Sequence, residues 1–296
     1  MSLALDMLRA AAKAQSLRPD VARRAARFIR SKALPDGGFA GRAPASDLYY
    51  TAFAMQTLAA LGQQAPAASA AYLGVFGAGG SLDFVHLACL ARCWSVWQDG
   101  APAPDVRRAS PAHLESFRSS DGGYHLAPGA PAGTAYGAFL ALGAYQDLQS
   151  PLPDPAGLAR SVESLRTGDG GFANQHDLPF GSTAATAAAV AVLRELGRPA
   201  DRATADWLLA RRSPAAAGFV PFAFEGAAPD LLSTATALAA LASAGAALGD
   251  EPRRACREFV LALEGPGGGF RGQADEADAD CEYTFYGLLA LGHLAE

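Results

Sequence analysis

The stretch DGGFAGRAPASDLYYTAFAMQTLAALG, residues 36–62, decides the fold of this chain. It consists of a Gly-Gly-aromatic turn, a short polar loop, an acidic helix start at Asp47, and a helix rich in Ala, Leu and aromatic residues. Related stretches recur at 77–94, 121–143, 169–197, 218–245 and 267–292. The turn aromatic stands at positions 124, 172, 219 and 270, a spacing of 47 to 51 residues. Such a period is typical of stacked helical repeats.

Each repeat is predicted to contain two helices. The first is amphipathic and rich in Arg, which predicts an outer layer at 19–34, 104–119, 153–167, 199–212 and 249–264. The second is apolar nearly all round, which predicts interior helices at 47–61, 83–97, 133–145, 182–196, 230–244 and 280–294. An open array would expose apolar terminal faces, so we expect the helices to close into a ring. The predicted fold is all-α, an (α/α)6 toroid formed by one domain spanning 1–296.

Composition excludes several classes of protein. Half of the residues are hydrophobic and the net charge is −5 without a basic stripe, so we expect no nucleic-acid partner. Residues 1–15 lack the apolar core of a signal peptide. Residues 231–249 are uncharged, but they occupy an inner-helix position, so we expect a buried helix and no membrane span. The four cysteines form no disulfide-like pattern, which predicts a cytoplasmic protein.

In such a toroid the inner helices run in the same direction, and their N-termini meet at one mouth. Unpaired amides and aligned helix dipoles favour an anion there. Aromatic side chains below the mouth would hold an apolar chain. An anionic head with an apolar tail describes an isoprenoid diphosphate, although another apolar-tailed ligand is possible and each aromatic could simply pack the core. The candidate ligand-binding aromatics are Tyr49, Tyr50, Phe53, Trp94, Tyr136 and Tyr286.

The repeat resembles the β subunit of protein prenyltransferases and the related squalene/hopene cyclase repeats over essentially the whole chain. Residues 37–53 are similar to the β-subunit segment that carries diphosphate-binding and zinc-binding residues. The resemblance implies a diphosphate contact for Arg42 and Tyr50 and a zinc ligand at Asp47. Tyr49 stands where the family has a cysteine ligand. The family also implies a possible α-subunit-like protein partner.

The resemblance extends to a possible metal site. His86, in Asp-Phe-Val-His, matches the position of the family's zinc histidine, while Tyr283 holds the histidine position of the last repeat. In a closed ring Asp280 and Glu282 could approach Asp47 and His86, which predicts a zinc or magnesium site made by these four residues.

Capping is the alternative role for the acidic residues that precede the inner helices. Short acidic side chains favour the N-cap position, which would explain the recurrence of Asp47, Asp83, Asp230 and Asp280.

Three functions remain open from the sequence. The leading hypothesis is transfer of a prenyl group, with Asp47, Asp280 and Tyr283 as candidate catalytic residues. The second is a toroid without catalytic activity that binds a protein or lipid. The third is a terpene-cyclase-like enzyme, because residues 278–281 resemble the Asp-x-Asp-Asp element of type II cyclases at three positions, including Asp278. Cyclases of that family also carry a second helical domain, for which this chain has no residues.

Overall fold

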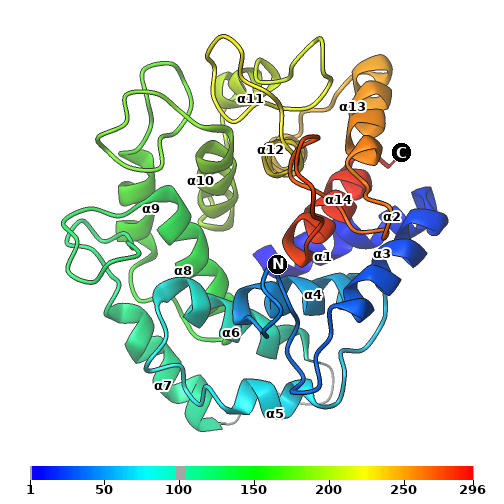
Figure 1. Ribbon diagram of the computed structural model, residues 1–296. Helices are drawn as coiled ribbons and strands as arrows, with labels where there is room; N and C mark the ends of the chain where they lie inside the picture. Colours follow the sequence, from blue (N-terminus) through cyan, green and yellow to red (C-terminus); the bar gives the residue numbers. More distant parts are fainter. Residues whose placement is uncertain (1, 98–103, 296) are drawn as a thin grey trace.

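The computed structural model describes residues 2–97 and 104–295, and within them helices alternate between an inner and an outer layer (Figure 1). The inner helices are α4 (Leu48–Ala60), α6 (Phe84–Val96), α8 (Ala135–Asp147), α10 (Thr183–Glu195), α12 (Leu231–Ser243) and α14 (Cys281–His293). The outer helices are α3 (Pro19–Ser31), α5 (Ser69–Gly74), α7 (Pro104–Glu115), α9 (Pro155–Glu163), α11 (Arg202–Leu209) and α13 (Asp250–Ala262).

The inner helices close into a ring. Each packs against the next, and α14 packs against α4 (Figure 1). The seam between the last and first repeats also carries an ion pair in which Arg24 Nη2 lies 2.8 Å from Glu264 Oε2. The predicted all-α toroid is therefore confirmed. None of the described helices combines the length and the hydropathy that crossing a membrane requires.

Every inner helix begins at a side-chain cap. The N-cap residues have extended backbones, and their side chains accept hydrogen bonds from amides of the first turn; they are Asp47, Asp83, Thr134, Ser182, Asp230 and Asp280. Such a cap contributes about 1 kcal/mol. The predicted capping role of the four aspartates is confirmed, and the caps place all six N-termini at the same end of the described ring.

Gly-Gly-aromatic turns follow four of the described outer helices, and the turn before α12 has Ala-Gly-Phe in the same place. The first glycine adopts a positive φ, for example +93° at Gly37 and +96° at Gly170, which glycine tolerates without steric cost. The aromatic that follows is fully buried, and in four of the described repeats its amide donates to a threonine hydroxyl in the next inner helix. The Phe172 amide lies 2.9 Å from Thr186 Oγ1, and the same bond recurs from Phe39, Phe219 and Phe270.

Helix α1 (Leu3–Ala12) closes the end of the ring opposite the mouth, and α2 (Ala14–Leu17) follows it. The Leu3 amide donates to Gln146 in α8, and the backbone carbonyl of Ala10 lies against Gly292 in α14. Both partners stand at the C-terminal ends of their helices. The sequence did not predict this floor, nor the short outer helix α5 in the second repeat.

Candidate active site in the central well

The inner helices turn three layers of side chains toward the ring centre. Positions two, six and nine after an N-cap share one helix face, because an α-helix has about 3.6 residues per turn. The upper layer consists of Tyr49, Val85, Tyr136, Ala184, Leu232 and Glu282. The middle layer consists of Phe53, Cys89, Leu140, Ala188, Thr236 and Tyr286. The lower layer consists of Gln56, Arg92, Gly143, Ala191, Ala239 and Leu289.

The upper layer is exposed to solvent, whereas Cys89, Gln56 and Leu289 below it are buried. Every member of the upper layer is at least partly exposed, and Tyr136 is 36% exposed. Partial exposure continues downward at Ala188 and Thr236 and then at Ala191 and Ala239. Because outer helices and α1 cover the other sides, this exposure points to space at the centre of the ring. We call this space the well.

The wall of the well has two different halves. On α14, α4 and α8 it carries aromatic rings, with the Phe53 and Tyr286 centroids 5.6 Å apart and the Tyr49 and Phe53 centroids 5.0 Å apart. On α10 and α12 it carries mainly small side chains. Aromatic ring faces attract cations, and small side chains leave room for a ligand. We call these halves the aromatic wall and the small wall.

Glu282 is the acidic group of the upper layer. Its Oε1 accepts a hydrogen bond of 2.7 Å from the Tyr49 hydroxyl across the seam between α14 and α4. Burial raises the pKa of Glu282, the hydrogen bond from Tyr49 opposes the rise, and the nearby Asp280 carboxylate adds to it. A carboxyl in such surroundings holds its proton to higher pH than an exposed glutamate does. Glu282 is therefore suited to proton donation into the well.

Asp280 and Arg42 form an ion pair at the mouth. Arg42 Nε lies 3.2 Å from Asp280 Oδ2, and Arg42 Nη2 lies 3.7 Å from Glu276 Oε2. The Asp280 side chain is 1% exposed and also caps α14 by accepting from the Tyr283 amide. Burial raises the pKa of Asp280, while the Tyr283 amide and Arg42 oppose the rise. Arg42 thus already faces two carboxylates.

The mouth offers less to an anion than the sequence suggested. First-turn amides of all the described inner helices are already used by their N-cap side chains, and four of these caps are aspartates. The cation predicted to hold a diphosphate, Arg42, is paired with Asp280 and Glu276. Each N-cap therefore takes at least one amide per helix away from the predicted anion site, and at four of the helices it adds a carboxylate there.

The four residues predicted to bind a metal do not form one site. Among the described residues, no group of three or more His, Cys, Asp or Glu side chains lies close enough to hold an ion. Asp280 is paired with Arg42, and Glu282 accepts from a tyrosine. Asp47 accepts from two backbone amides, and His86 Nδ1 lies 2.9 Å from both oxygens of Asp83. Because each of these side chains is already paired elsewhere, the four residues do not fit a zinc or magnesium site.

The other candidate residues on α4, α8 and α14 lie either in the well or at its rim. Tyr49, Phe53, Tyr136 and Tyr286 lie in the two upper layers. Tyr50 and Tyr283 lie at the rim, where their rings pack against Gly41 and Gly272.

Trp94 and Asp278 lie outside the well. Trp94 is eleven positions after its N-cap, on the opposite face of α6, and it packs with the cluster around Met55 and Leu73. Asp278 is exposed in the loop before α14.

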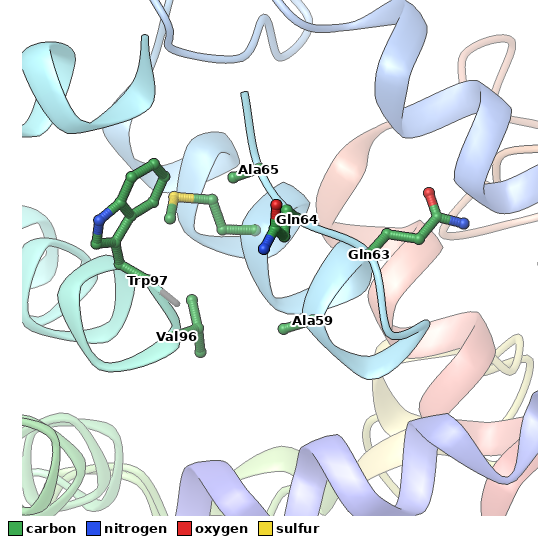
Figure 2. A pocket seen from close by; sticks show the side chains of 7 residues that line it. Ala59, Gln63, Gln64, Ala65, Val96 and Trp97 are labelled. Atoms are coloured by element: carbon green, nitrogen blue, oxygen red, sulfur yellow. The ribbon is translucent and has the colours of Figure 1, made fainter. Parts of the chain in front are cut away.

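A small cavity beside α4 is a separate feature. It has a volume of about 10 Å³ and is lined by Met55, Ala59, Gln63, Gln64, Ala65, Val96 and Trp97 (Figure 2). This volume is near the minimum for a single water molecule, so the cavity is too small for a substrate.

The lower layer contains a polar group that sequence reasoning missed. Arg92 Nε lies 2.6 Å from Asp147 Oδ2, and Arg92 Nη1 donates to Gln56 Oε1 over 2.7 Å. The guanidinium fits against Gly143, where a Cβ would lie 3.3 Å from Arg92 Nη2. Counting positions from each predicted N-cap could have identified this group, because that count alone defines the layers.

A closed ring of helical hairpins around a well defines the chain as an α/α toroid protein. The sequence model of the prenyltransferase alpha-alpha toroid domain matches residues 1–75, 107–226 and 215–295. The chain belongs to this family, which confirms the resemblance noted from the repeats. No curated protein sequence matches the chain.

Solved structures share the fold at low sequence identity. A type II terpene cyclase, MstE from Scytonema, in complex with geranylgeranyl dihydroxybenzoate, is 15% identical, with a TM-score of 0.61 over 96% of this chain and 97% of that chain. A protein from Actinoplanes is 16% identical, with a TM-score of 0.64 over 93% and 98%. Candida albicans protein geranylgeranyltransferase-I, complexed with GGPP, is 14% identical, with a TM-score of 0.54 over 72% of this chain. The chain spans 66% of that transferase chain.

These matches correct one argument from length. The expectation that a cyclase needs a second helical domain is not general, because this chain covers 97% of the Scytonema type II terpene cyclase chain.

Proposed function

We propose that this protein binds an uncharged isoprenoid chain in the well and cyclises it by proton transfer from Glu282. The observation that carries the proposal is the position of this carboxyl. It stands in the upper layer, bonded to Tyr49, with the rings of Phe53 and Tyr286 in the layer below.

The proposed reaction conserves atoms and charge. The Glu282 carboxyl gives its proton to one carbon of an alkene, and the two π electrons of that alkene form the new C–H bond. The resulting tertiary carbocation is attacked by the π electrons of the next alkene, which forms a ring C–C bond. Loss of a proton to a base ends the reaction, so the product is an isomer of the substrate. Ring faces of the aromatic wall stabilise the cation while it lasts.

The charge at the mouth supports an uncharged chain over a diphosphate. Arg42 is paired with two carboxylates, and aspartates cap four of the inner helices. A diphosphate would bring further negative charge next to them. Prenyl transfer from a diphosphate, the leading hypothesis from the sequence, therefore has less support from this geometry than cyclisation has.

Incubation in D2O tests the proposal. The purified protein is given farnesol or geranylgeraniol, and products are analysed by mass spectrometry and NMR. We expect a cyclic isomer carrying one deuterium at a carbon from solvent, and no such product from Glu282→Gln. Binding of geranylgeraniol without turnover would favour the toroid without catalytic activity. Binding of geranylgeranyl diphosphate without binding of geranylgeraniol, in the presence or absence of Mg²⁺, would favour prenyl transfer.

A further inference from the structure

A second cavity lies on the outside of the ring, between the end of α9 and the start of α11. Its volume is about 300 Å³, which is the lower end of the range for ligand pockets. Phe172, Val190 and Leu193 form its apolar floor, and Glu163 and Arg198 are at its edge. Val190 and Leu193 are on the face of α10 opposite Ala188, so this cavity is separate from the well.

The preceding repeat shows what the cavity lacks. The segment ESFRSSDGGY (115–124) corresponds to ESLRTGDGGF (163–172), and both repeats keep the same spacing up to the end of their inner helices. Glu115 therefore corresponds to Glu163, Tyr124 to Phe172, and Tyr145 to Leu193.

In the preceding repeat, two phenols occupy this place. The Tyr145 hydroxyl donates to Glu115 Oε1 over 2.6 Å, and the Tyr124 hydroxyl donates to the same oxygen. Both rings are buried, and their centroids are 6.3 Å apart.

The next repeat lacks the two tyrosine rings that fill this place. Leucine replaces one tyrosine and phenylalanine replaces the other. Glu163 is no longer bound by phenols. It is half exposed and pairs with Arg198, whose Nη1 lies 2.6 Å from Glu163 Oε2. All of these replacement residues line the cavity.

We propose that this cavity is a binding site for a small phenol, whose ring takes the place of the missing Tyr145 ring and whose hydroxyl donates to Glu163. Apolar walls accept the ring, and the carboxylate accepts the hydroxyl proton as Glu115 does in the preceding repeat. Arg198 supplies a cation beside the ring. The proposal is independent of any reaction in the well.

Calorimetry and NMR with p-cresol test this site on the full chain. We expect one p-cresol per chain, with shifts at Leu193 and Val190, and an affinity roughly 2- to 10-fold higher than that for toluene because of the added hydrogen bond. Leu193→Tyr fills the space and is expected to abolish binding. Tyr145→Leu is the matched variant, and it is expected to open a second site beside Glu115.

Two outcomes would overturn the proposal. One is the absence of p-cresol binding to the wild-type chain. The other is equal binding to the wild type and to a filled variant. Ala200→Leu provides a second, smaller filling if Leu193→Tyr does not fold, and it is expected to weaken p-cresol binding at least about threefold, as expected for overpacking of a site. Glu163→Gln should reduce the preference for p-cresol over toluene and leave toluene binding unchanged.

Discussion

The aromatic wall and the small wall of the well have the same backbone framework and opposite side chains. Both are built from helices that begin at a side-chain cap and have positions two, six and nine on the face toward the centre. The aromatic wall adds Glu282, Tyr49, Phe53 and Tyr286, whereas α10 adds only alanines at those positions. The difference shows that the polar and aromatic groups of the inner face are concentrated at the seam where the last repeat meets the first, and that the opposite side carries smaller side chains.

The largest effect is expected at the acid of the aromatic wall. Glu282→Gln keeps the size of the side chain and removes the transferable proton, so turnover should fall about 10²- to 10⁴-fold. Product formation by chromatography is the measurement. Glu282→Asp is the control that retains a carboxyl and should recover part of the rate. Full activity in Glu282→Gln would exclude the proposed acid.

The dependence of stability on pH tests whether Glu282 is protonated in the folded state. Because burial raises the pKa of Glu282, the folded state holds a proton that the unfolded state releases. The free energy of unfolding should therefore fall as pH rises from the ordinary glutamate range towards the raised pKa, and turnover should fall as the acid ionises. Glu282→Gln should reduce that dependence of stability on pH in chemical denaturation.

The next effect tests the room at the small wall. Ala188→Phe places a ring in the middle layer, where Ala188 is partly exposed. Overpacking costs about 1–3 kcal/mol, so binding of geranylgeraniol should weaken roughly 5- to 150-fold by calorimetry. Thr236→Val is the matched control. Its hydroxyl already donates to the Leu232 carbonyl over 2.7 Å, so removing it changes little of the shape. Unchanged binding of geranylgeraniol to Ala188→Phe would show that the isoprenoid does not lie beside Ala188.

A smaller effect is expected from the aromatic wall when only the ring is removed. Phe53→Leu keeps an apolar side chain between Tyr49 and Tyr286 and loses the ring face. A cation near an aromatic ring gains about 0.5–2 kcal/mol, so turnover should fall roughly 2- to 30-fold while binding changes less. Phe53→Tyr should retain most of the rate. An equal loss in both variants would indicate a packing role for the residue.

The sequence predicted the toroid because a repeat of 47 to 51 residues with a cap, a glycine turn and an apolar helix leaves few alternatives. The N-caps at Asp47, Asp83, Asp230 and Asp280 followed from local chemistry alone. Helix α1 was missed because its role as a floor depends on contacts with residues such as Gln146, far away in the sequence.

The site was harder to predict than the fold. Tyr49, Phe53, Tyr136 and Tyr286 lie in the two upper layers, and their role in ligand binding stays a prediction, whereas Trp94 lies on the outer face of its helix. Composition alone could not separate these cases, since both faces of an interior helix are apolar. Glu282 was predicted as a metal ligand, and its partner turned out to be the Tyr49 hydroxyl, because ring closure sets that pair.

The smallest effect is expected at the mouth, where Arg42 is 53% exposed beside Asp280. The Arg42 side of this pair is screened by solvent, and such ion pairs contribute about 0–1 kcal/mol, so Arg42→Gln should lower the free energy of unfolding by about 1 kcal/mol or less in urea denaturation. Asp280 keeps its hydrogen bond from the Tyr283 amide and can take up a proton. Binding of geranylgeraniol should stay unchanged, since the neutral chain lies among the rings below. A loss of more than about tenfold confined to geranylgeranyl diphosphate would instead make Arg42 a diphosphate ligand and reverse the comparison, because the mouth would then contribute more to binding than either wall does.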